Sequence, residues 1–65
     1  MLTYIVNKDD VHKPIACKEL TYTALPRVGE KIIAYGELYE VTAVYHNLDL
    51  QEIKIVTEKV LTGDN

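Results

Sequence analysis

The chain has few of the residues that usually hold a small protein together. Only one of its 65 residues, Cys17, is a cysteine, which excludes a disulfide within the chain. The candidate metal ligands His12, Cys17 and His46 are too few and too scattered for a closed zinc site. Because a core of this size is marginal without such links, we expect a homo-oligomer. A monomeric barrel is the alternative, since many domains of about 55–65 residues fold alone.

Long apolar runs and clusters of basic residues are also missing. No run approaches the roughly 18 apolar residues that a membrane span needs, so we expect no membrane partner. The seven basic and ten acidic residues are interspersed and give a net charge of −3, which leaves no basic patch for phosphates. Nucleic acid is therefore a disfavoured partner. A lone cysteine and no signal peptide favour a reducing cytoplasm.

The most informative stretch is residues 25–55. It contains a Pro–x–x–Gly turn, two β-rich runs joined by a short glycine turn, and a third β-rich run after a polar loop. Such a series of runs is typical of a strand meander, and 65 residues allow one domain at most. We therefore predict a single all-β domain over residues 1–65.

Five strands are predicted, at residues 1–6, 17–23, 30–35, 38–46 and 52–57. Residues 7–14 contain Asn, Asp and Pro, which form turns, and are predicted to be a polar loop. The sequence PRVG at residues 26–29 predicts a turn. Residues 36–37, with glycine first, predict a two-residue hairpin turn of type II′.

The run at residues 38–46 breaks its own alternation of apolar and polar side chains. One extra residue near positions 42–43 restores a single apolar face, because a β-bulge shifts the alternation by one and bends the strand. That face would hold Tyr39, Val41, Val44 and His46. Small closed barrels need such bends at their corners, so we predict a bulged central strand.

Two segments are ambiguous between helix and strand. Over residues 15–22, Pro14 at a first helical position favours a short helix, whereas the Thr–Tyr–Thr sequence at 21–23 favours a strand. Over residues 50–60, a capping-box pattern and an apolar stripe favour a helix. Four of the five residues at 53–57 are β-branched, however, and such side chains suit a strand. We predict a strand in both cases.

A pattern of segments carries a resemblance to known proteins. These segments are PRVGEKI at 26–32, GELYEV at 36–41, VYH at 44–46 and IKI at 53–55. In them the chain resembles small Src-homology-3-like β-barrel proteins of phages and other mobile elements. The resemblance implies a five-stranded, partly open barrel and a phage or mobile-element accessory protein in the host cytoplasm. Its residues are structural, so it carries no catalytic residue across.

The candidate binding residues combine aromatic, basic and imidazole side chains. Tyrosine joins a flat apolar face to a hydroxyl, which suits interfaces, although the five tyrosines could instead cap the barrel ends. Arg27, the only arginine, could bind a carboxylate or phosphate from its turn, or be a solvated turn charge. His46 is either a ligand contact or a hydrogen-bonded histidine at the barrel rim. The predicted set is Tyr22, Arg27, Lys31, Tyr35, Tyr39, Tyr45 and His46.

The resemblance, together with a chain that has room for one interface but little for a catalytic shell, predicts a non-catalytic binding protein of phage or mobile-element type. It would sequester or inhibit a host factor, as counter-defence or regulation. A host protein is favoured over a small anionic ligand such as a signalling nucleotide, because an acidic chain repels anions. The alternative is a structural or assembly oligomer joined through edge strands, and a barrel binding single-stranded nucleic acid ranks third. No spacing pairs a nucleophile with a base, so we expect neither an enzyme nor a cofactor or metal.

Overall fold

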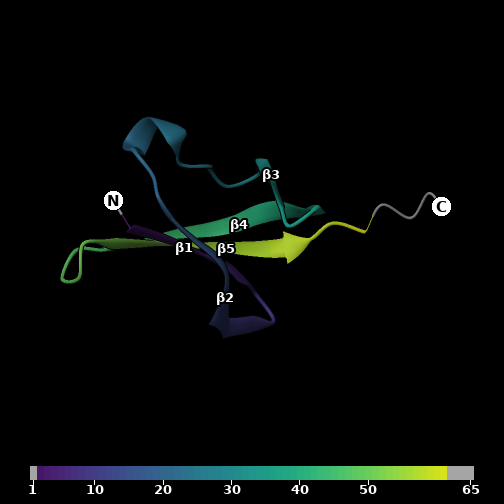
Figure 1. Cartoon of the computed structure of the whole chain (residues 1–65), viewed down its shortest axis with the longest axis horizontal. Helices are drawn as coiled ribbons and strands as arrows, with labels where there is room; N and C mark the ends of the chain where they lie inside the picture. Colours follow the sequence, from purple (N-terminus) through teal and green to yellow (C-terminus); the bar gives the residue numbers. More distant parts are fainter. Residues whose placement is uncertain (1, 62–65) are drawn as a thin grey trace.

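The computed structural model describes residues 2–61 except for the side chain of Tyr22, and nearly all of this part is β-structure (Figure 1). The elements are β1 (Leu2–Asn7), β2 (Asp10–Glu19), the single 3₁₀ turn η1 (Tyr22–Ala24), β3 (Lys31–Ala34), β4 (Glu37–Asn47) and β5 (Glu52–Lys59). The all-β prediction is therefore confirmed. Residue 1 of the first predicted strand lies outside the described residues. Within residues 2–61, no helix has the length and apolarity needed to cross a membrane.

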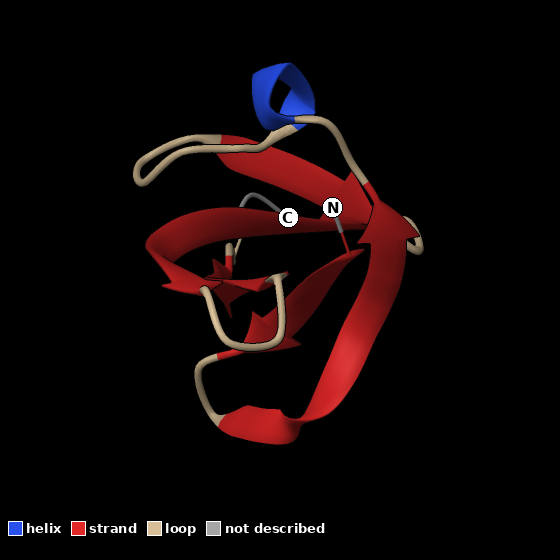
Figure 2. Ribbon diagram, turned by 90° about the vertical axis from the view of Figure 1, so that its left-hand side faces the viewer, coloured by secondary structure: helices blue, strands red, loops and turns tan. Residues whose placement is uncertain are grey.

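The five strands form one sheet in the order β2-β1-β5-β4-β3. β1 and β5 pair in parallel, and the other three pairs are antiparallel. Figure 2 shows how this sheet curls around its inner face, with η1 beyond one rim. Neither β2 nor β3 has a second partner strand among the described residues, so the barrel stays partly open. This confirms the prediction of a small, five-stranded, partly open barrel.

The core lies on the inner face of the central strands. Ile5, Val41, Ile53 and Ile55 form one buried cluster, with Ile32 and Val44 packed against it. Removing an isoleucine side chain from water contributes about 1.5–3 kcal/mol. Thr57 continues the same face of β5, and its buried hydroxyl donates a hydrogen bond of 2.8 Å to the carbonyl oxygen of Val6.

A β-bulge in β4 aligns the apolar side chains with this core. Val41 pairs with Thr57 and Ala43 with Val56, which leaves Thr42 as the extra residue. Val44 then lies opposite the buried Ile55. The predicted bulge is confirmed, and because of it Val41 before the bulge and Val44 after it both face the core.

Both turns around β3 differ from the prediction by one residue. The hairpin turn is Tyr35–Gly36, not residues 36–37, because Ala34 pairs with Glu37. Tyr35 has a φ of 52° and Gly36 a φ of 77°, so the turn is type I′ rather than II′, and its twist matches the flanking strands. The turn predicted at 26–29 lies one residue later, closed by a 2.9 Å hydrogen bond from Glu30 N to Arg27 O.

The largest error in the prediction concerns β2. Residues 7–14 are not a loop: the turn is only Lys8 and Asp9, and β2 begins at Asp10. The strand predicted at 17–23 ends at Glu19, and the chain then forms η1. Pro14 is accommodated because β2 is an edge strand whose pairing with β1 is irregular at this point. The strand predicted at 52–57 is confirmed and extends to Lys59.

Candidate functional site

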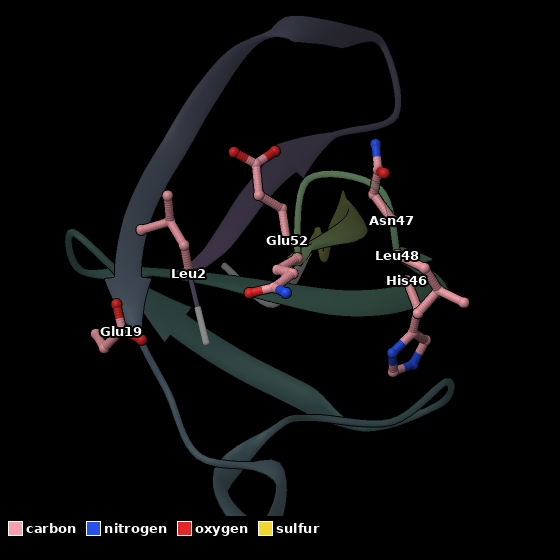
Figure 3. A pocket seen from close by; sticks show the side chains of 7 residues that line it. Leu2, Glu19, His46, Asn47, Leu48 and Glu52 are labelled. Atoms are coloured by element: carbon pink, nitrogen blue, oxygen red, sulfur yellow. The ribbon is translucent and has the colours of Figure 1, made fainter.

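Two adjacent hollows lie where β4 passes into β5. The first has a volume of about 530 Å³, and Figure 3 shows Leu2 and Glu19 on one side of it and His46 and Leu48 on the other. The second, of about 550 Å³, lies on the outer face of the sheet. We call this second hollow the Tyr45 groove; its lining includes Tyr4, Val11, Tyr45, Leu50, Lys54 and Val56. Asn47 and Glu52 line both hollows, so together they form one continuous surface.

The Tyr45 groove presents large apolar side chains to solvent. Tyr45 pairs with Lys54, and the bulge places it on the outer face, where its side chain is 61% exposed. Leu50 is 64% exposed on the β4–β5 loop. The backbone N of Leu50 donates a 3.1 Å hydrogen bond to Asn47 Oδ1, which fixes the conformation of the loop. An exposed apolar surface with a polar rim is typical of a protein interface.

Charged groups form the rim of the Tyr45 groove. The hydroxyl of Tyr4 approaches Glu52 Oε2 at 3.5 Å, a long hydrogen bond. The pKa of Tyr4 is raised above its ordinary value of 10.0. The main cause is the negative charge of Glu52, and burial of the hydroxyl is the second. Lys8 forms an exposed ion pair of 3.4 Å with Glu58. Both signs of charge thus surround an apolar centre.

A third hollow brings two of the predicted residues together. Arg27 and His46 both line this depression of about 330 Å³. The rest of its lining is apolar and includes Val28 and Val44. A carboxylate lies at the same turn, because Arg27 N donates a 2.8 Å hydrogen bond to Glu30 Oε1. The charge of Glu30 opposes the binding of an anion by Arg27.

The other predicted residues are dispersed. Lys31 lies opposite Glu40 in the β3–β4 hairpin, and Tyr35 is exposed in the turn of that hairpin. Tyr39 belongs to the core with 9% of its side chain exposed, so we assign it a structural role. The side chain of Tyr22 lies outside the described part of the chain. Of the six predicted residues whose side chains the structure describes, only Arg27 and His46 therefore share a hollow.

Sequence reasoning missed most of the surface that the first hollow and the Tyr45 groove form together. Leu48 and Leu50 lie in a segment interpreted only as a polar loop or helix start, and Val11 lies in a segment predicted to be a loop. Two leucines within five residues of a loop were the signal available, since exposed apolar residues in a short turn have no packing role. Tyr4 gave no such signal, because an aromatic residue in a strand usually contributes to a core.

The hollows of the described part of the chain are open surfaces that a partner could contact. Among residues 2–61, no group of three or more His, Cys, Asp or Glu side chains is placed to hold a metal ion. Each hollow described above is open to solvent. The second and third are lined mainly by apolar side chains, whereas most residues that line the first are polar or charged. The fold and its surface define a small, partly open all-β barrel protein. No known family model, curated protein or solved structure matches the chain.

Proposed function

We propose that the chain is a non-catalytic binding protein that sequesters a host protein, and that the Tyr45 groove is its contact surface. One observation carries the proposal: Tyr45 and Leu50 are more than half exposed around a hollow of about 550 Å³. Tyrosine and other large side chains in such positions supply most of the binding energy in protein interfaces. The flanking Lys54 and Glu52 would form the polar rim that orients a partner.

A small anionic ligand has less support from the same structure. The carboxylate of Glu30 lies beside Arg27, and Lys31 lies opposite Glu40. Glu19 and Glu52 contribute two further carboxylates to the lining of the first hollow, which His46 also lines. Neighbouring carboxylates weaken the attraction of each cation for a phosphate, so the protein target remains the favoured class.

The biological setting of the proposal rests on the resemblance to phage and mobile-element barrels alone. In that setting the partner is a bacterial protein, and binding blocks the partner's own surface. An assembly role remains the alternative function, and it would use copies of this chain in place of a host protein.

The test is site-directed photo-crosslinking in bacterial cells that produce the chain. The crosslinker p-benzoylphenylalanine replaces Tyr45 in one variant and Val28 in the control. The two positions are matched, since Tyr45 is 61% and Val28 is 63% exposed, but Val28 lies outside the groove. We expect one host protein to be captured from position 45 and not from position 28, and capture to be lost when Leu50→Asp is added.

The captured protein is then purified and its affinity for the unmodified chain is measured. Saturable binding that Tyr45→Ala weakens and Val28→Ala leaves unchanged would support the proposal. Equal capture from both positions would refute the groove as the contact surface. Crosslinks formed only between copies of this chain would favour the assembly role instead.

A further inference from the structure

The two free edges of the sheet face a hollow of their own. This hollow has a volume of about 370 Å³, and residues from both edge strands line it. Ala16 and Lys18 contribute from β2, and Ile32, Ile33 and Ala34 contribute from β3. It shares no residue with the Tyr45 groove. The place where the barrel fails to close is therefore a lined opening, which we call the edge gap.

The backbone of β3 has hydrogen-bonding groups directed into this opening. Across the two-residue turn, Ala34 and Glu37 form a hydrogen-bonded pair, so the even-numbered residues of β3 bond to β4. The 2.8 Å hydrogen bond from Val41 N to Glu30 O follows the same alternation. The N–H and C=O groups of Lys31 and Ile33 consequently point away from β4. No strand within residues 2–61 pairs with that side of β3.

The opposite side of the edge gap is also a strand edge. The hydrogen bond of 2.8 Å from Lys8 N to Thr57 O shows that the even-numbered residues of β1 direct their backbone groups toward β5. Ile5 therefore bonds to Ala16 across the β1–β2 pair, and Cys17 directs its backbone groups away from β1. The edge gap thus lies between two strands that each direct backbone N–H and C=O groups away from their paired strand.

The edges and the chemistry of the edge gap indicate what fits there. An extended strand pairs with a free strand edge at about 4.8 Å through its own N–H and C=O groups, whereas a helix uses those groups within itself. Apart from Lys18, every described residue that lines the edge gap is uncharged, and most are apolar.

From these features we propose that the edge gap accepts an extended segment of a partner protein as a sixth strand. The segment pairs with the outward backbone groups of Lys31 and Ile33, in the manner of β-strand addition. Its alternate side chains are apolar and face Ile32 and Ala16, and one acidic side chain meets Lys18. This surface is independent of the Tyr45 groove.

The test is selection from a displayed library of random nine-residue peptides. The immobilised chain is the target, and an Ile33→Pro variant is used for counter-selection. Proline removes the outward N–H of residue 33, while the hydrogen bonds between β3 and β4 do not use that group. Ile33→Thr is the matched control, because threonine keeps the N–H and suits a strand.

We expect the selected peptides to alternate apolar and polar residues and to share one Asp or Glu. Ile33→Pro should weaken their binding about tenfold or more, the loss expected for a hydrogen bond and its neighbours, whereas Ile33→Thr and Tyr45→Ala should leave it nearly unchanged. Selection on Lys18→Glu should replace the acidic residue with Lys or Arg. In the unmodified chain, a bound peptide should protect the amides of Lys31 and Ile33 from hydrogen exchange.

Four results would overturn the proposal. Peptides that bind Ile33→Pro as tightly as the unmodified chain would place them elsewhere, and so would unchanged exchange at Lys31 and Ile33. Failure to enrich any peptide over the Ile33→Pro background would show that the edge gap binds no strand. Concentration-dependent pairing of copies that Ile33→Pro abolishes and the peptides do not displace would assign the edge to a second copy of this chain.

Discussion

The two faces of the β4–β5 hairpin are formed by neighbouring residues, but we assign them different roles. On the inner face, Ile53 and Ile55 are 0% exposed and touch the core. On the outer face of the same strands, Tyr45 and Lys54 are exposed to solvent. The comparison shows that one hairpin supplies both the stability of this small barrel and its proposed binding surface, so the two roles can be separated by substitution.

The largest expected effect is on the inner face. Ile55→Ala should lower the free energy of unfolding by about 2–5 kcal/mol, because it removes buried methyl groups and leaves a cavity. For a domain of this size that is a large share of the total, since stability is about 0.05–0.15 kcal/mol per residue. Urea unfolding followed by circular dichroism would measure the change. A loss below about 1 kcal/mol would mean that Ile55 is not part of a tight core.

The matched outer-face change is Tyr45→Ala. Because Tyr45 is largely exposed, its loss should alter the free energy of unfolding by no more than about 0.5 kcal/mol. Binding to the captured partner should weaken by about 2 kcal/mol, or roughly 30-fold, as for an interface residue that dominates binding. Calorimetric titration of the variant and of Val28→Ala would compare the two surfaces. If Tyr45→Ala lowered the free energy of unfolding as much as Ile55→Ala does, the two faces would not have separate roles.

A smaller effect is expected from the polar member of the inner face. Thr57→Val keeps the shape of the side chain but leaves the carbonyl oxygen of Val6 without the 2.8 Å hydrogen bond. The register of β1 and β5 also directs the backbone N–H of Thr57 to this oxygen, so the oxygen keeps one partner and the expected loss is that of a single hydrogen bond, about 0.5–1.5 kcal/mol. Urea unfolding would again measure it, with Thr42→Val as the control, because the Thr42 hydroxyl is exposed. Equal effects of the two substitutions would show that burial does not set the strength of these bonds.

The sequence predicts the inner face better than the outer one, and the reason is physical. The core residues repeat with the period of a strand, and the break in that period around Thr42 can only be repaired by a bulge. The extent of β2 could not be predicted, because residues 10–14 have the composition of a turn. They form a strand only because β1 lies alongside them.

The residues of the proposed binding surface were only partly predictable. Tyr45 and His46 were chosen for their chemistry, and the bulge places Tyr45 on the outer face. The contributions of Val11 and Leu50 depend on the β1–β2 and β4–β5 turns, which bring them to one surface. No periodic pattern records such proximity between separate turns, because it depends on tertiary structure.

The smallest expected effect belongs to the outer face and is a dependence on pH. The charge of Glu52 raises the pKa of Tyr4 above 10.0, so the folded chain holds this proton more tightly than the unfolded chain does. This contribution to stability is fully present below the unfolded-state pKa and is lost as the pH rises through the folded-state pKa. Carbon-13 NMR of the tyrosine ζ-carbons would follow the titration. Glu52→Gln should move the pKa of Tyr4 toward its ordinary value. Glu58→Gln is the control and should not, because the carboxylate of Glu58 pairs with Lys8. If the titration were unchanged in Glu52→Gln, burial, and not the carboxylate at the groove rim, would control the pKa of this tyrosine.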